Sequence, residues 1–224
     1  MFYPQCLWII AILWKTAICC FVQCRTRQRR RGQKMSYEPR KAAQLIAYLI
    51  QKSGGKSLDF LKSVKLVYLS DRESVARFGF PILDEPRYSL PHGPINSETM
   101  DRMNGAFSDD AEAQEWLALL SDKADNKIGL TVEKISRDDL DELSDADIEC
   151  ANAVWEKFGH MSPWALREWT HDHLPEWQDP GRGRRPITVL SLMRSVGVEN
   201  AEEAARVSEG LKRIDAAFEM ARVR

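Results

Sequence analysis

The stretch Ser57–Phe78, SLDFLKSVKLVYLSDRESVARF, sets the fold class of this chain. Apolar residues recur along it at helical spacing, so the sequence predicts one helix over residues 57–78. Ser57 is the expected N-cap of this helix, and Gly79 is its expected stop. One face of this predicted helix carries Phe60, Leu61, Val64, Val67, Tyr68, Asp71, Val75 and Phe78, which are apolar or aromatic apart from Asp71.

Asp71 is a carboxylate in line with this apolar face. A carboxylate in such surroundings must find hydrogen-bond donors or be neutralised. The nearest expected donors are the backbone N–H groups of the tight turn Pro91-His92-Gly93-Pro94. We therefore predict that Asp71 pins the segment 80–96 against the helix. This role is structural, because neither a partner base nor a nucleophile accompanies the carboxylate.

The rest of the chain is mostly helical in its patterning. Residues 80–96 contain four prolines, which predicts a loop with at most short extended pieces. Residues 127–135 alternate apolar and polar side chains and predict a strand, whereas residues 174–186 predict a loop. Further helices are expected near 39–53, 97–106, 109–121, 145–158, 162–173, 187–196 and 199–222. The expected fold class is mainly α, a compact multi-helix domain with a small β element.

Residues 1–34 differ in composition from the rest. They hold four of the five cysteines, seven basic residues and no acidic ones. In one interpretation, residues 1–24 anchor the protein in the inner membrane and the basic stretch 25–34 keeps residues 35–224 in the cytoplasm. Lys15, however, interrupts the run of about 20 apolar residues that a spanning helix needs. In the other interpretation, which we favour, Met35 is the true first residue. Residues 1–34, which we call the leader, are then translated only because the start codon was assigned wrongly.

Residues 35–224 are expected to form a single domain. Of the 32 basic and 33 acidic residues in the chain, seven basic ones lie in the leader, which leaves a net charge of −8. This charge argues against broad binding of nucleic acid or of anionic membranes. Cys150 is the only cysteine in the domain, so a disulfide framework is excluded and the reducing cytoplasm is the expected location.

No motif predicts a catalytic residue, a metal or a cofactor. Gly54-Gly55-Lys56-Ser57 lacks the earlier glycine that a phosphate-binding loop requires. Unless the helix has ended before them, His171 and His173 point roughly 200° apart and cannot bind one zinc ion together. Cys150 lies in a helical pattern and is expected in the core. A metal-dependent hydrolase remains a minor alternative, which would use His160, His171, Asp172 or His173.

Several short blocks occur in an order and spacing that point to a known family. They are Lys65–Glu73 (KLVYLSDRE), Gly79–Ile82 (GFPI), His92–Ser97 (HGPINS), Leu143–Asp145 (LSD), Trp155–Gly159 (WEKFG), Leu166–His171 (LREWTH) and Pro175–Trp177 (PEW). Together they resemble the Panacea domain of SocA-like antitoxins and phage-associated proteins, over residues 38–190, with C-terminal helices over 187–222. Ile95 departs from the valine common in the family. The motif residues, of structural or unknown role, are Lys65, Tyr68, Asp71, Gly93, Pro94 and His171.

The resemblance implies a helical domain with a small sheet that acts by binding and is not an enzyme. Such proteins neutralise a cognate protein toxin, usually the product of the adjacent gene. The SocA type also acts as an adaptor that presents its toxin to a ClpXP-type protease. The family has no established catalytic residues. A membrane-tethered sensor or defence component is the alternative if residues 1–34 are real.

Candidate contacts with a partner are aromatic and Arg side chains in the expected loops. Trp, Tyr and Arg dominate the energetics of protein interfaces. The candidates are Arg87, Tyr88, Trp177, Arg182, Arg184 and Arg185.

Overall fold

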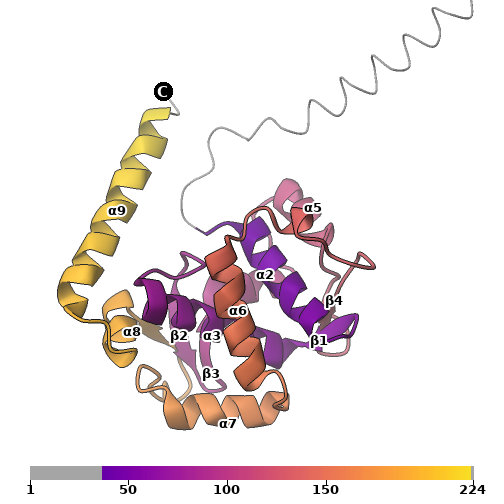
Figure 1. Ribbon diagram of the computed structural model, residues 1–224, viewed down its shortest axis with the longest axis horizontal. Helices are drawn as coiled ribbons and strands as arrows, with labels where there is room; N and C mark the ends of the chain where they lie inside the picture. The colour runs from indigo at the N-terminus through magenta and orange to yellow at the C-terminus, as the bar shows by residue number, and fades with distance from the viewer. Residues whose placement is uncertain (1–36, 223–224) are drawn as a thin grey trace, which may run out of the picture. The chain divides into compact units, whose positions relative to one another are not determined.

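The structure is a computed structural model that describes residues 37–222, and residues 37–213 lie within one compact unit (Figure 1). The leader, residues 1–34, lies outside the described residues. The helices are α2 Pro39–Lys52, α3 Phe60–Phe78, α4 Ser97–Met103, α5 Asp110–Leu117, η1 Asp138–Leu140, α6 Asp145–Phe158, α7 Pro163–His173, α8 Val189–Ser195 and α9 Ala201–Arg222. The predicted fold class, mainly α with a small β element, is confirmed.

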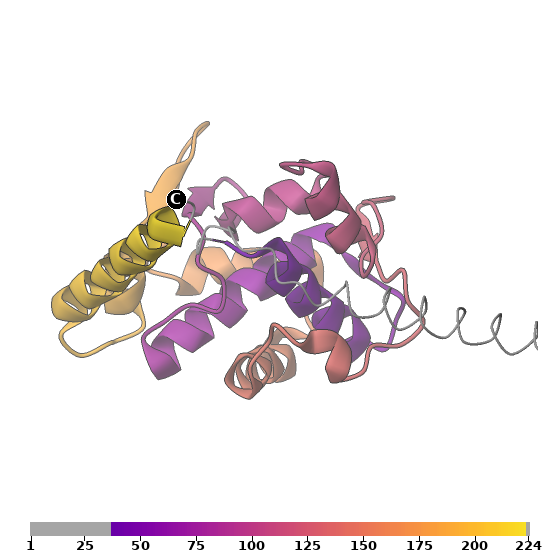
Figure 2. The same ribbon diagram turned by 90° about the horizontal axis from the view of Figure 1, so that it is seen from above.

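The helix α3 contacts α2, α6, α7, α8 and both sheets. The helices α2 and α3 form a central layer, with α6 on one side and α4 and α5 on the other (Figure 2). The core between these layers is apolar and includes Leu45, Leu49, Leu66 and Trp116, each at most 1% exposed. Residues 63–71 of α3 are buried on every side of the helix, whereas Phe78, which the sequence pattern placed on the apolar face, is 47% exposed.

The start of α3 differs from the sequence prediction. Residues 57–59 are not the first helical turn but a strand, β1 Ser57–Asp59, which pairs antiparallel with β4 Lys127–Gly129. The N-cap is Asp59, whose side chain accepts a hydrogen bond from the Lys62 backbone N–H at 3.1 Å. Ser57 is committed to strand pairing and cannot cap the helix. At the other end Gly79 stops α3 in the left-handed conformation, as predicted, with φ of 78°.

The second sheet has the strand order β3-β2-β5. The strands β2 Arg87–Leu90 and β3 Gly93–Asn96 form a hairpin, and β5 Arg185–Ile187 pairs with the other side of β2. The extended pieces expected in residues 80–96 thus pair with each other, and the end of the expected 174–186 loop is a strand. The strand predicted over 127–135 is shorter, because β1 offers only three residues to pair with it.

The other predicted helices are present within a few residues of their expected ends. Ser144 and Asp147 form a capping box at the start of α6. Ser162 caps α7, and Pro163 is its first residue. Within residues 37–222, none of the helices combines the length and the apolarity that crossing a bilayer would require.

Candidate functional site

Asp71 lies at the centre of a buried polar network on α3. Its Oδ1 accepts a hydrogen bond from the Leu83 backbone N–H at 2.8 Å. Its Oδ2 accepts hydrogen bonds from Arg87 Nη2 at 2.6 Å and from Asn96 Nδ2 at 2.8 Å. The predicted contact between Asp71 and the segment 80–96 is therefore present, although its donors are not the backbone N–H groups of residues 91–94.

The turn at residues 91–94 is held by Lys65 instead. The Lys65 ammonium donates to the Pro94 carbonyl oxygen at 2.7 Å, and the side chain has no exposure to solvent. Burial, followed by the nearby charge of Arg167, lowers the pKa of Lys65 to about 7. A buried lysine therefore fastens the start of β3 to the middle of α3.

Gly93 permits this close approach. Its φ is +93°, and an added Cβ would lie 2.8 Å from both Lys65 Nζ and Thr170 Oγ1. A residue with a side chain would meet both an unfavourable backbone conformation and a steric clash. The glycine of the Gly93-Pro94 motif is thus required by geometry.

Glu85 extends the network of Asp71. Its carboxylate accepts hydrogen bonds from the Thr99 hydroxyl at 2.5 Å, the Thr99 backbone N–H at 2.8 Å and Asn96 Nδ2 at 3.2 Å. Burial raises the pKa of Glu85 to about 7, against the opposing effect of the Thr99 hydrogen bonds. Asn96 therefore links two buried carboxylates, and Arg87 compensates the charge of Asp71 directly.

Tyr68 lies one turn from both Lys65 and Asp71. Its hydroxyl donates to Glu176 Oε1 at 3.1 Å, and Arg72 Nε donates to the same oxygen at 2.8 Å. Burial and the Glu176 charge raise the pKa of Tyr68 well above its usual value. Three successive turns of α3 thereby hold two segments of the chain, residues 83–96 through Lys65 and Asp71, and the loop at Glu176 through Tyr68. We call Lys65, Tyr68, Asp71 and their partners the α3 frame.

The α3 frame contains five of the six motif residues that the resemblance singled out. The sixth, His171, stacks on Trp177 with ring centroids 4.0 Å apart. Burial lowers the pKa of His171, followed by the charges of Arg167 and Lys65. The side chains of Lys65, Tyr68 and Asp71 are 0% exposed, so a molecule in solution cannot reach these three groups. What they do in this structure is hold other segments of the chain against α3.

One predicted contact residue is not on the surface. Arg87 is only 4% exposed, because its guanidinium is drawn inward by Asp71 and by the Leu83 carbonyl oxygen. It therefore belongs to the α3 frame, and a partner in solution cannot reach it. The placement of Arg87 as an exposed loop residue was wrong.

The other predicted contact residues lie on or near the outer part of the sheet. The Arg184 guanidinium carbon lies 4.7 Å from the centre of the half-buried Tyr88 ring. Arg185 donates to Gln178 Oε1 at 2.8 Å. Trp177 is half-buried and donates from Nε1 to the Leu90 carbonyl oxygen at 3.0 Å. Arg182 is exposed in the loop before β5.

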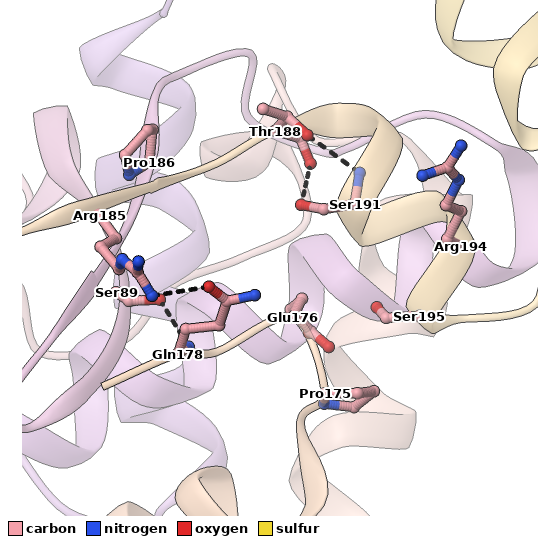
Figure 3. Close-up of a pocket in the computed structure, with 10 residues that line it drawn as sticks. All are labelled: Ser89, Pro175, Glu176, Gln178, Arg185, Pro186, Thr188, Ser191, Arg194 and Ser195. Carbon is pink, nitrogen blue, oxygen red and sulfur yellow. Dashed lines mark hydrogen bonds between the residues drawn. The ribbon is translucent and has the colours of Figure 1, made fainter. Parts of the chain in front are cut away.

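A polar groove of about 570 Å³ opens beside β5 (Figure 3). One side is formed by Arg185 and Pro186, and the other by Ser191, Arg194 and further residues of the α8 region. Hydrogen bonds within the walls fix several of these side chains, including Ser191 to the Thr188 carbonyl oxygen at 2.8 Å. The Glu176 side chain is fully shielded, so only the main chain of this residue reaches the groove.

Sequence reasoning missed Trp164 as a surface residue. This side chain is 63% exposed at the start of α7 and meets His92, at the tip of the β2–β3 hairpin, edge to face at 6.1 Å. A helical wheel would have indicated it, since Trp164 falls off the side of α7 that buries Leu166 and Thr170. Between residues 37 and 222, the structure assembles no group of His, Cys, Asp or Glu residues suited to a metal ion.

The structure is thus a mainly helical domain in which a shielded polar frame attaches a small sheet to the central helix. The model of the family described as antitoxin SocA-like, Panacea domain, matches residues 64–178, just over half of the chain. The chain belongs to this family, and its role is antitoxin-like. The match contains all the α3 residues of the frame but not β5 or α8. Neither a curated protein nor a solved structure gives a match.

Proposed function

We propose that this chain is a non-enzymatic antitoxin that binds and neutralises a cognate protein toxin encoded by the adjacent gene. Residues 35–224 act as one domain in the cytoplasm. Membership of the family supports the general role. The observation that carries the proposal is that three aromatic and arginine side chains flank the edge strand β5: Arg184 lies over Tyr88 on one face of the sheet, and Arg185, in register with Ser89, lies on the other face beside the polar groove. We call these three residues the sheet surface.

The sheet surface is suited to protein recognition because its side chains are held before a partner arrives. Arg184 lies over the Tyr88 ring, and Arg185 is fixed by Gln178. Pre-ordered side chains lose less entropy on binding, which favours affinity. The α3 frame holds the β2–β3 hairpin through Arg87 of β2 and Asn96 of β3. Tyrosine and arginine are also the residues that carry most binding energy at interfaces.

The charge of the domain supports a basic partner. Residues 35–224 carry a net charge of −8, and opposite net charge accelerates association. Many proteins that act on nucleic acid or on translation present basic surfaces, and these are common toxin classes. The arginines of the sheet surface provide local hydrogen-bond donors, whereas the overall charge acts at longer range.

Co-expression with the adjacent open reading frame tests the proposal. The neighbour should arrest growth when induced alone, and growth should return when this chain is induced as well. The triple variant Tyr88→Ala/Arg184→Ala/Arg185→Ala should lose both rescue and co-purification. Arg77→Ala, an exposed arginine at the end of α3, serves as the matched control and should rescue fully. A harmless neighbour, or full rescue by the triple variant, would contradict the proposal.

Two further measurements define how neutralisation works. Faster decay of the toxin in cells that contain a ClpXP-type protease indicates delivery for proteolysis, and unchanged decay indicates blocking. Rescue by residues 35–224 alone shows that the leader is dispensable. Rescue by residues 1–224 only, with the protein in the membrane fraction, favours the tethered alternative.

A further inference from the structure

The polar groove beside β5 has two arginines with hydrogen-bond donors to spare. Arg185 of β5 and Arg194 of α8 lie on opposite sides of the groove (Figure 3). Arg185 donates from Nη1 to Gln178 Oε1 at 2.8 Å, and Arg194 donates from Nη2 to Glu202 Oε1 at 2.5 Å. A guanidinium group has five N–H donors, so each arginine keeps several that no other described residue accepts.

Two hydroxyl groups of the groove lining add further donors. Ser89 Oγ accepts the Gln178 backbone N–H at 3.2 Å, and Thr188 Oγ1 accepts the Ser191 backbone N–H at 3.0 Å. Among the described residues, no acceptor takes the proton of either hydroxyl. Ser89 is only 1% exposed and lies in register with Arg185, so the two side chains are neighbours on one face of the sheet. The groove therefore holds a buried hydroxyl beside one of its arginines.

The described residues place no accessible carboxylate inside the groove to balance these donors. Glu176 is the one acidic residue of the lining, and its shielded side chain accepts hydrogen bonds from Tyr68 and Arg72 instead. Glu202 pairs with Arg194 but does not line the groove. Two positive charges and several oriented donors thus surround an open volume of about 570 Å³. This arrangement is suited to an anion, because hydrogen bonds between charged groups are the strongest that side chains make.

We propose that the groove binds a small molecule that carries at least two phosphate groups, one at Arg185 and one at Arg194. A phosphate group offers three acceptor oxygens, which can bind an arginine and a neighbouring hydroxyl at the same time, whereas a carboxylate offers two. The volume of the groove falls within the range of roughly 300–1,000 Å³ that small-molecule sites occupy. Pro175 and Pro186 of the lining provide apolar surface for the rest of the ligand.

Isothermal titration calorimetry of the full-length chain with inorganic pyrophosphate tests the site. The wild-type protein should bind one pyrophosphate per chain, and Arg185→Gln and Arg194→Gln should each raise its Kd about ten-fold or more, because each removes charged hydrogen-bond donors. Arg182→Gln is the matched control, since it removes the same charge from an exposed position in the loop before β5, outside the groove lining. It should leave the Kd unchanged. A wild-type protein that binds no pyrophosphate, or an equal loss in Arg182→Gln, overturns the proposal.

Two further titrations test the location and the chemistry of the site. Ser89→Ala should raise the Kd for pyrophosphate several-fold without any change of charge, and urea denaturation checks that this variant stays folded. An unchanged Kd in folded Ser89→Ala overturns the placement in the groove. Citrate, which carries carboxylates but no phosphate, should bind the wild-type protein about ten-fold more weakly than pyrophosphate, and equal binding overturns the assignment to phosphate. These titrations contain no toxin, so their outcome is separate from that of growth rescue.

Discussion

Arg87 and Asp71 form an ion pair of 2.6 Å in which the two side chains are only 2% and 0% exposed. Arg87 is the first residue of β2, and Asp71 lies on α3, so the pair joins the sheet to the central helix. Both charged groups are buried, and each is compensated by the other and by neutral hydrogen-bond partners. Removal of one member leaves the other buried and unpaired, which is far more costly than the loss of a surface pair.

The variant Asp71→Ala should therefore be strongly destabilised. We expect a loss of about 3–5 kcal/mol in the free energy of unfolding, and a fall in Tm of about 10 °C or more, measured by urea and thermal denaturation. The control is Glu73→Ala on the same helix, where a half-exposed i,i+4 pair with Arg77 is removed. That change should cost at most about 0.5 kcal/mol. Equal effects of the two variants would show that Asp71 is not an anchor.

Gly93→Ala should disrupt the attachment of the hairpin to α3. The new Cβ would clash with Lys65 Nζ and Thr170 Oγ1 and would occupy a positive φ. We expect a cost of about 2–5 kcal/mol from the combined strain and overpacking. Gly181→Ala is a matched control, because its φ is also positive, at +61°, but no atom lies within 4 Å of the new Cβ. It should cost only about 1 kcal/mol, and an equally small cost at Gly93 would mean that the turn adjusts freely.

The titrations of Glu85 and Lys65 should give the stability of the protein a minimum near pH 7. The pKa of Glu85 is raised from 4.5 to about 7, so the folded state binds the proton more tightly, and stability falls as the pH rises from about 4.5 to 7. The pKa of Lys65 is lowered from 10.5 to about 7, so the folded state favours the neutral amine, and stability rises as the pH rises from about 7 to 10.5.

Urea denaturation across this pH range separates the two groups. Glu85→Gln should flatten the slope below pH 7, and Lys65→Met should flatten the slope above pH 7. The slope of the free energy of unfolding against pH is measured within each variant, so a change in its absolute stability does not affect the comparison. A monotonic profile in the wild-type protein, or a profile unaltered by both variants, would refute the assignment of the pH dependence to Lys65 and Glu85.

Two tryptophans should respond in opposite ways to truncation. Trp116 is 1% exposed and packs against Phe107, so Trp116→Ala should cost about 3–5 kcal/mol. Trp164 is 63% exposed, so Trp164→Ala should change stability by less than about 0.5 kcal/mol. Calorimetry of both variants checks the contrast. A large loss in the free energy of unfolding of Trp164→Ala would show that this side chain stabilises the fold. It would then no longer be a candidate surface contact.

Helix positions were predictable because their signals are local. The helix expected near 145–158 is α6 Asp145–Phe158, and the pattern around Ser162 and Pro163 gave the start of α7. Caps, stops and apolar periodicity all act within a few residues, so a single sequence contains them. The strand β5 was not predictable in this way. Its three residues become a strand only because β2, far away in sequence, offers them a pairing partner.

The position of Asp71 in an apolar stripe predicted an anchor, and the segment it contacts was also expected. The donors were not, because Leu83, Arg87 and Asn96 are separated from Asp71 by 12, 16 and 25 residues. The same distance in sequence made Arg87 look like a loop residue open to solvent. Nothing in the residues around Arg87 indicates a carboxylate that lies on another element.

The sequence by itself determined the fold class, the central helix and the family. Periodicity and caps depend on residues close together in the chain, and the family follows from the order and spacing of short motif blocks. Only the tertiary structure decided that Lys65, Tyr68 and Asp71 form one shielded frame, that Arg87 is buried, and that Tyr88 and Arg184 share a surface. The physical reason is that burial and pairing depend on which segments pack together, and that choice is made by the whole chain at once.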